Sequence, residues 1–158
     1  MATEIERKFL LANDSWRQQV TKKLTLKQGY FGAAKKASIR IRVSGDTANI
    51  NIKSATLGIV RKEYEIPVSL KDAEEMLKDL CERPVIEKVR HIVPLGNHVW
   101  EIDEFSGDNQ GLIVAEIELS NPDEDFEKPD WLGYEVSLDE RYYNVCLVKN
   151  PYKNWRDE

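Results

Sequence analysis

Six pairs of like-charged side chains, each spaced two residues apart, are the feature of this sequence with the clearest chemical content. Four of the pairs are acidic and two are basic: Glu4/Glu6, Glu63/Glu65, Glu101/Asp103, Glu116/Glu118, Arg40/Arg42 and Lys88/Arg90. On a β-strand, residues i and i+2 point to the same face of the sheet, about 7 Å apart. Like charges at that spacing do not stabilise each other, so an explanation for the pairs has to come from the solvent, ligand or opposite charges in front of that face.

Two interpretations are open from the residues alone. In the first, an ordinary half-buried sheet exposes its charged face to solvent, where salt screens the repulsion over about 8 Å. In the second, the sheet closes into a barrel and the charged faces line its interior. Clustered carboxylates suit a hard divalent cation such as Mg²⁺ or Mn²⁺, and Arg and Lys suit a polyanion. A single pair fits the first interpretation; six together favour the second, a metal–polyphosphate site.

The elements that must position these residues are mostly strands. Alternation of apolar and polar residues with period two predicts eight strands, at residues 3–11, 24–31, 37–43, 48–54, 59–68, 85–93, 98–105 and 112–119. Apolar residues at helical spacing predict one clear helix over residues 69–80. We also expect a short helical turn at 15–22, an acidic loop at 121–128 leading to a short helix, and a helix over 137–149. The result is an antiparallel α+β fold in a single domain spanning residues 1–158.

Composition narrows the class of protein. The chain has 158 residues and a net charge of −5, which argues against nucleic-acid binding through a basic surface. No apolar run approaches the ~20 residues of a membrane helix, and Met1 is followed by charged residues rather than a signal peptide. Cys81 and Cys146 are expected as reduced thiols. We therefore expect a cytoplasmic protein with no membrane and no nucleic acid among its partners.

The N-terminal motif connects the charged pairs to a known family. Glu4-Ile5-Glu6-Arg7-Lys8 matches an E-x-E-x-K signature, and its companions follow in order along the chain: Ser38–Arg42, Asn51–Lys53, Glu63–Glu65, Glu87–Arg90, Trp100–Asp103 and Ala115–Leu119. With these motifs the chain resembles the CYTH superfamily, the triphosphate tunnel metalloenzymes. The resemblance covers essentially the whole chain. It implies a closed eight-stranded antiparallel β-barrel with a charged lumen and flanking helices, binding triphosphates together with a divalent metal.

The resemblance also implies roles for individual residues. It makes Glu4, Glu6 and Lys8 catalytic. The expected phosphate-binding residues are Lys8, Arg40, Arg42, Lys53, Lys88 and Arg90, with the hydroxyl of Tyr30 nearby unless that ring only packs beside Gly29. The expected metal ligands are Glu4, Glu6, Glu116 and Glu118, with Asp103 as a further one. Glu63 and Glu65 face the lumen, where they orient basic residues or help to hold a second metal; the general base is not assigned.

Several activities are known in the family that the chain resembles. We expect Mg²⁺- or Mn²⁺-dependent hydrolysis of inorganic tripolyphosphate, because the aromatic-containing segment that precedes the first strand in many cyclases is absent here. A class IV-type adenylate cyclase, a thiamine or nucleoside triphosphatase, and a non-catalytic polyphosphate- or nucleotide-binding module are the alternatives. The partner is then a small-molecule triphosphate, and a homodimer is plausible by analogy with related proteins.

Overall fold

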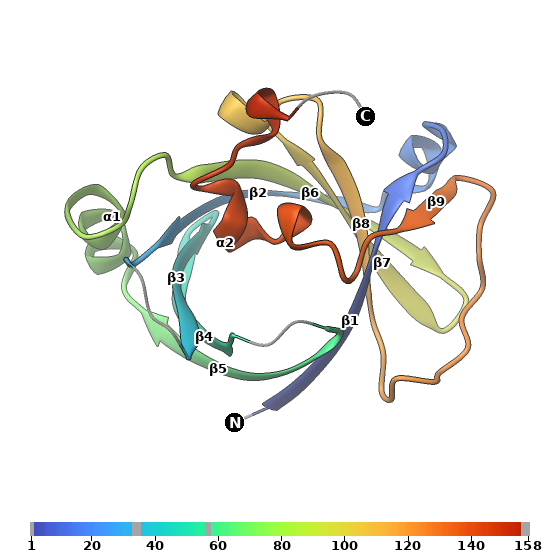
Figure 1. The fold of residues 1–158 in the computed structure, drawn as a ribbon, viewed down its shortest axis with the longest axis horizontal. Coiled ribbons are helices and arrows are strands. Elements are labelled where there is room, and N and C mark those ends of the chain that lie inside the picture. Colours follow the sequence, from blue (N-terminus) through green and yellow to red (C-terminus); the bar gives the residue numbers. More distant parts are fainter. Residues whose placement is uncertain (1, 33–35, 56–57, 156–158) are drawn as a thin grey trace.

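A closed β-barrel forms the body of the protein (Figure 1). The computed structural model describes residues 2–32, 36–55 and 58–155. Within them the strands are β1 (Ala2–Leu11), β2 (Lys22–Tyr30), β3 (Ala37–Ser44), β4 (Thr47–Ser54), β5 (Val60–Val68), β6 (Ile86–Leu95), β7 (His98–Phe105), β8 (Ile113–Glu118) and β9 (Leu132–Glu135). Their order is β5-β4-β3-β2-β6-β7-β8-β1-β9, and an additional β5–β1 pairing closes eight of them into a ring. All pairings are antiparallel, so the expected eight-stranded barrel is confirmed.

The first strand holds the ring closed. Its N-terminal half pairs with β5, from Ala2 opposite Glu63 to Ile5 opposite Val60. Its second half pairs with β8 along the opposite edge. Beyond the end of the β5 pairing, the C-terminal end of β1 pairs with β9 along the edge that β5 occupied. The extra strand β9 was not expected, because four residues are too few to display a periodic pattern.

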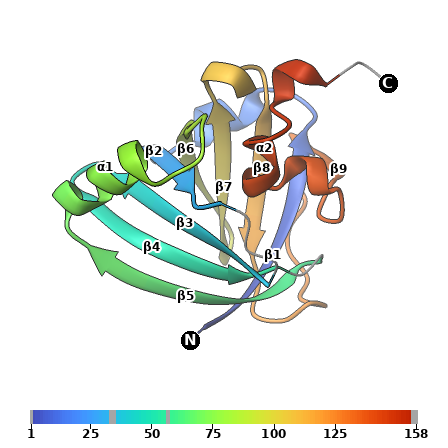
Figure 2. The same ribbon diagram turned by 60° about the vertical axis from the view of Figure 1, so that its left-hand side comes forward.

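Outside the barrel, helices and loops cover the apolar strand faces. The helix α1 (Leu70–Asp79) begins at Ser69, whose hydroxyl accepts from the Asp72 backbone N–H at 3.1 Å, and it buries Ala73 and Leu77 against β3 and β4 (Figure 2). The prediction of a helix at 69–80 is therefore confirmed. On the other side, Trp16 of the 3₁₀ turn Ser15–Gln19 and Trp131, just before β9, are buried in one apolar cluster with Trp100 of β7.

In Figure 1 the part of the C-terminal segment from Glu140 to Leu147 lies inside the outline of the ring of strands, whereas the turn at Tyr152–Asn154 lies outside it. The helix expected over 137–149 is wrong in extent: a 3₁₀ turn at Glu140–Tyr142 is followed by the four-residue helix α2 (Asn144–Leu147). Leu147 and Val148 pack on Ile86, Phe105 and other apolar residues at the ends of the lumen-facing rows. This apolar cluster fixes α2 at one end of the lumen.

The remaining short elements are 3₁₀ turns at Gly107–Asn109 and Tyr152–Asn154. The helix expected to follow the acidic loop at 121–128 does not form. Glu124 there accepts from the backbone N–H of Ser120 at 2.6 Å and bonds to His98, which holds the segment as an irregular loop. Among the helices in the described ranges, none combines the length and the apolar character required to cross a membrane.

Candidate active site

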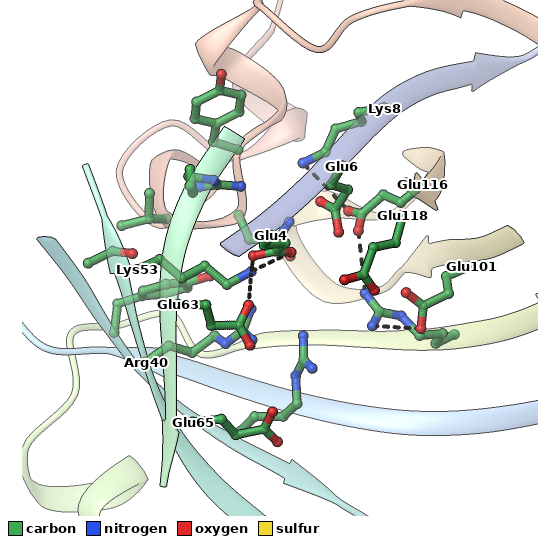
Figure 3. Close-up of a pocket in the computed structure, with 18 of the residues that line it drawn as sticks. Glu4, Glu6, Lys8, Arg40, Lys53, Glu63, Glu65, Glu101, Glu116 and Glu118 are labelled. Carbon is green, nitrogen blue, oxygen red and sulfur yellow. Dashed lines mark hydrogen bonds and ion pairs between the residues drawn. The ribbon is translucent and has the colours of Figure 1, made fainter. Parts of the chain in front are cut away.

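A cavity of about 380 Å³ occupies the lumen of the barrel. It is lined by residues from all eight barrel strands, together with two residues of α2 and the residue that precedes it. Thirteen of the fourteen predicted site residues are among them: Glu4, Glu6, Lys8, Tyr30, Arg40, Arg42, Lys53, Glu63, Glu65, Lys88, Arg90, Glu116 and Glu118 (Figure 3). The period-two alternation of the strands therefore brings these residues into one cavity, as the closed-barrel interpretation required.

One wall of the cavity is acidic. Strands β1 and β8 are neighbours, with Glu6 opposite Glu118 and Lys8 opposite Glu116. Their carboxylates crowd together, and burial followed by the charge of Glu116 raises the pKa of Glu6 well above its usual value. Burial also opposes ionisation of Glu116, but Lys8, Arg90 and Lys88 outweigh it and lower its pKa. Glu116 is thus neutralised by Lys8 of the same wall and by Lys88 and Arg90 of β6.

The opposite wall is basic, with Arg40 and Arg42 from β3 and Lys88 and Arg90 from β6. Burial, followed by the charges of Arg40 and Arg90, lowers the pKa of Arg42 to about 10. Arg42 is therefore short of negative charge, whereas the burial of Arg90 is outweighed by Asp103, Glu101 and Glu116, which raise its pKa.

Near the place where β5 pairs with β1, Lys53 of β4 contacts two carboxylates. Its Nζ lies 3.1 Å from Glu4 Oε2 and 3.6 Å from Glu63 Oε2. Burial raises the pKa of Glu4, but a hydrogen bond with Glu63 and the charge of Lys53 outweigh burial and lower it to about 2. Glu65 is more exposed and accepts from Asn49 Nδ2 at 2.8 Å.

Asp103 is the predicted site residue that does not line the cavity. Its side chain is fully buried and accepts from Lys88 Nζ at 2.7 Å and from Arg90 Nε and Nη2 at 2.8 and 2.9 Å. Its neighbour on the same face, Glu101, lines the cavity instead and lies 3.2 Å from Arg90. Burial lowers the pKa of Lys88 to about 7, although Asp103 opposes the shift.

The C-terminal segment supplies lining residues that the sequence patterns did not reveal. The Lys8 Nζ donates to the backbone carbonyl of Tyr142 at 3.1 Å, and Lys88 Nζ donates to Asn144 Oδ1 at 2.9 Å. Tyr143 lies between Lys8 and Arg61, each about 5.5 Å from its ring centre. Arg61 shares a strand face with Glu63 and was detectable from alternation. Tyr143 and Asn144 come from a segment without periodic signal.

A hard divalent cation fits the donor chemistry of the acidic wall. Within residues 2–32, 36–55 and 58–155, no three His, Cys, Asp or Glu side chains already stand at metal-binding geometry. The oxygens available are nevertheless all carboxylate, the ligand type that Mg²⁺ and Mn²⁺ prefer. Burial, followed by the charge of Glu116, raises the pKa of Glu6, and a bound cation would oppose both effects. Glu4, Glu6, Glu116 and Glu118 are the residues that would hold it.

Comparison with known proteins agrees with this geometry. The chain is 45% identical over 157 residues to a protein of Acetivibrio thermocellus named inorganic triphosphatase, covering 99% of this chain and 100% of that one. It is 34% identical to an inorganic triphosphatase of Nitrosomonas europaea, over 92% and 97% of the two chains. A crystal structure of an inorganic triphosphatase superposes with a TM-score of 0.66 at 32% identity, covering 94% and 95%. A Hippeastrum protein described as a putative adenylyl cyclase with dominant triphosphatase activity, 17% identical with a TM-score of 0.60, shares the fold over 75% of this chain and 80% of its own. The CYTH domain model matches residues 2–144, and the chain therefore belongs to the CYTH domain family.

Proposed function

We propose that this protein is a divalent-metal-dependent hydrolase of inorganic tripolyphosphate. The observation that carries the proposal is the pairing of an acidic wall with a basic wall in one buried cavity. Burial and the charge of Glu116 raise the pKa of Glu6, and burial and the charges of Arg40 and Arg90 lower that of Arg42, so each of these two groups lacks a full counter-charge. A polyphosphate neutralises the basic wall and a divalent cation neutralises the acidic wall. The relatives named inorganic triphosphatase support the same substrate.

In this proposal the basic residues bind the phosphate chain. Lys8, Arg40, Arg42, Lys53, Lys88 and Arg90 surround the cavity, and the burial of most of these side chains reduces screening by water and strengthens each ionic contact. They orient the terminal phosphoryl group and stabilise the charge that spreads over its oxygens during transfer. Tyr30 lines the same cavity and also packs in the apolar cluster beside α2, so its ring supports the end of the site.

The acidic residues divide into two roles. Glu4, Glu6, Glu116 and Glu118 hold Mg²⁺ or Mn²⁺, which when bound neutralises phosphate charge and polarises the phosphoryl group. Glu63 orients Lys53 from 3.6 Å. In place of the metal-ligand role expected for Asp103, we propose that this residue positions Lys88 and Arg90, because both of its oxygens already accept from them.

Organic triphosphates are the second candidate substrate class, and one observation favours them. A cavity of about 390 Å³ adjoins the lumen and shares Tyr30, Ser38, Arg61, Tyr143 and Val145 with it. Several of its other lining residues are apolar, among them Phe31 and Val148. An adenine or thiamine group attached to a triphosphate would find an apolar surface there.

Phosphate release tests the proposal directly. Inorganic tripolyphosphate, ATP and thiamine triphosphate are compared with Mg²⁺ and with Mn²⁺, and cyclic AMP is assayed beside them. We expect rapid release from tripolyphosphate that stops with EDTA and in Glu118→Gln, but continues in Glu127→Gln, a matched change on an exposed loop. Cyclic AMP as main product would overturn the reaction type. Binding without turnover of any triphosphate would leave a binding module.

A predicted homodimer, the absence of nucleic-acid partners and a cytoplasmic location stay predictions. Size-exclusion chromatography with light scattering measures the first of them.

A further inference from the structure

Asn144, at the start of α2, is held by two barrel strands at once. Its Oδ1 accepts from Lys88 Nζ of β6 at 2.9 Å and from Gln28 Nε2 of β2 at 3.2 Å. Gln28 is fully buried, and its own Oε1 accepts from Arg42 Nε at 2.8 Å. A continuous hydrogen-bonded chain therefore runs from Arg42 through Gln28 and Asn144 to Lys88, beneath the basic wall.

The two cations at the ends of this chain determine which way both amides point. Lysine ammonium and arginine guanidinium groups only donate hydrogen bonds, so each must meet an oxygen. Arg42 therefore fixes Gln28 with Oε1 toward it, which turns Gln28 Nε2 toward Asn144. Lys88 independently requires Asn144 Oδ1, and the two requirements agree. The usual ambiguity between oxygen and nitrogen in an amide is thus removed at both positions.

The same arrangement leaves one group of Asn144 free. Both donors meet the oxygen, and within the described residues Nδ2 has no hydrogen-bond partner. Asn144 lines the cavity beside Lys88 and Arg42. The side chain therefore has its two N–H donors available at the edge of the cavity in which the phosphates would bind. The burial of Leu147 and Val148 in the apolar cluster holds α2 in place, so this donor is fixed before a substrate arrives.

We propose that Asn144 is a substrate-binding residue whose Nδ2 donates to a phosphate oxygen of the triphosphate while its Oδ1 holds Lys88 and Gln28. The inference rests on the proposed function for the identity of the anion. It assigns to the C-terminal segment a direct part in recognition, beyond closing one end of the lumen. A neutral donor adds contact to an oxygen without adding to the repulsion between the cations of the basic wall.

Two substitutions separate donation from scaffolding. Asn144→Asp keeps an oxygen for Lys88 and Gln28 but replaces the donor with a second oxygen, whereas Asn144→Leu removes both groups. Asn150→Asp is the control: it makes the same charge change at an exposed position six residues away. Wild type and variants are compared by kcat and KM for tripolyphosphate, and by melting temperature.

We expect both Asn144 variants to raise KM for tripolyphosphate about 10- to 100-fold, as for the loss of a hydrogen bond to a charged group. Asn144→Asp should keep the melting temperature of the wild type, and Asn150→Asp should keep both values. A purely structural residue predicts the opposite for Asn144→Asp, namely rescue by the retained oxygen. A KM within twofold of wild type in that variant would overturn the proposal.

A spectroscopic measurement separates donation from simple repulsion by the new carboxylate. In ¹⁵N-labelled wild-type protein with EDTA, the side-chain NH₂ signals of Asn144 are those missing from the spectrum of Asn144→Asp. On titration with tripolyphosphate these signals should shift, while those of Asn150 should not. If the backbone signals shift and so report binding, but the side-chain NH₂ signals of Asn144 do not shift, the inference is overturned. If tripolyphosphate binds to the wild type and shifts the Asn144 NH₂ signals but no phosphate is released, the inference stands and the proposed hydrolysis fails.

Discussion

Asp103→Asn is the substitution whose consequences follow most directly from the structure. The change preserves shape but removes the charge from a fully buried carboxylate that accepts three hydrogen bonds from Lys88 and Arg90. Burial opposes ionisation of Asp103, yet Arg90 and Lys88 outweigh it and lower its pKa, so the wild-type group is ionised at neutral pH. The variant therefore leaves two buried cations with less compensation.

The size of the effect follows from the neighbours that remain. Removing one partner of a buried ion pair costs about 3–5 kcal/mol. Glu101 at 3.2 Å and Glu116 at 3.8 Å from Arg90 still offset part of the charge, so we expect the lower end, about 3 kcal/mol. For a chain of this size that corresponds to a fall in melting temperature of about 6–12 °C.

Urea unfolding of Asp103→Asn beside Glu104→Gln measures this loss. Glu104 is the next residue on β7, but its pair with Arg17, at 3.1 Å, is partly exposed, and glutamine keeps an oxygen for the contact with His91 Nε2. Exposed pairs contribute about 0.2–1 kcal/mol, so the control should change little. Equal losses in the two variants, or less than about 1 kcal/mol for Asp103→Asn, would refute the argument that burial makes this network important.

Kinetics of the same variant decide between the two roles considered for Asp103. A residue that positions Lys88 and Arg90 should raise KM for tripolyphosphate and leave the Mg²⁺ concentration for half-maximal rate unchanged. A metal ligand should raise that Mg²⁺ requirement instead. If Asp103→Asn alters the Mg²⁺ requirement and leaves KM unchanged, Asp103 is a metal ligand and not a positioning residue.

Three further outcomes are expected. Glu4→Gln should abolish phosphate release while circular dichroism and melting temperature show a retained fold, and a full rate would contradict its proposed metal role. Burial lowers the pKa of Lys88 to about 7, so between pH 7 and about 10.4 the unfolded chain binds more protons than the folded protein, and this group makes stability rise with pH. In Lys88→Met, the melting temperature measured from pH 7 to 9 should rise less steeply with pH than in the wild type. Gly133→Ala would place a Cβ 2.8 Å from the Leu10 carbonyl oxygen, so urea unfolding should show a loss of about 1–3 kcal/mol, whereas Gly32→Ala meets only ordinary contact and should be near neutral.

Strand periodicity made most of the site predictable. Alternation is a local property, so the like-charged pairs Arg40/Arg42 and Glu116/Glu118 could be assigned to shared faces without knowing the fold. The same reasoning identified α1, where apolar residues recur at helical spacing and Ser69 caps the start. Alternation does not show how far along the barrel axis a residue lies. Glu101 and Asp103 have the same alternation, yet one lines the cavity and the other lies buried between cations.

By itself, the sequence determined which strand side chains share a face and that their charges suit a metal and a polyanion, because those facts depend on residue type and a two-residue period. Only the tertiary structure decided that β1 stands between β8 and β5, which brings Glu6 beside Glu118 and Glu4 beside Lys53. It alone placed Asn144 against Lys88, 56 residues away in the chain. Contacts of this kind arise from ring closure and from the apolar packing of α2, and neither leaves a periodic trace in the residues it joins.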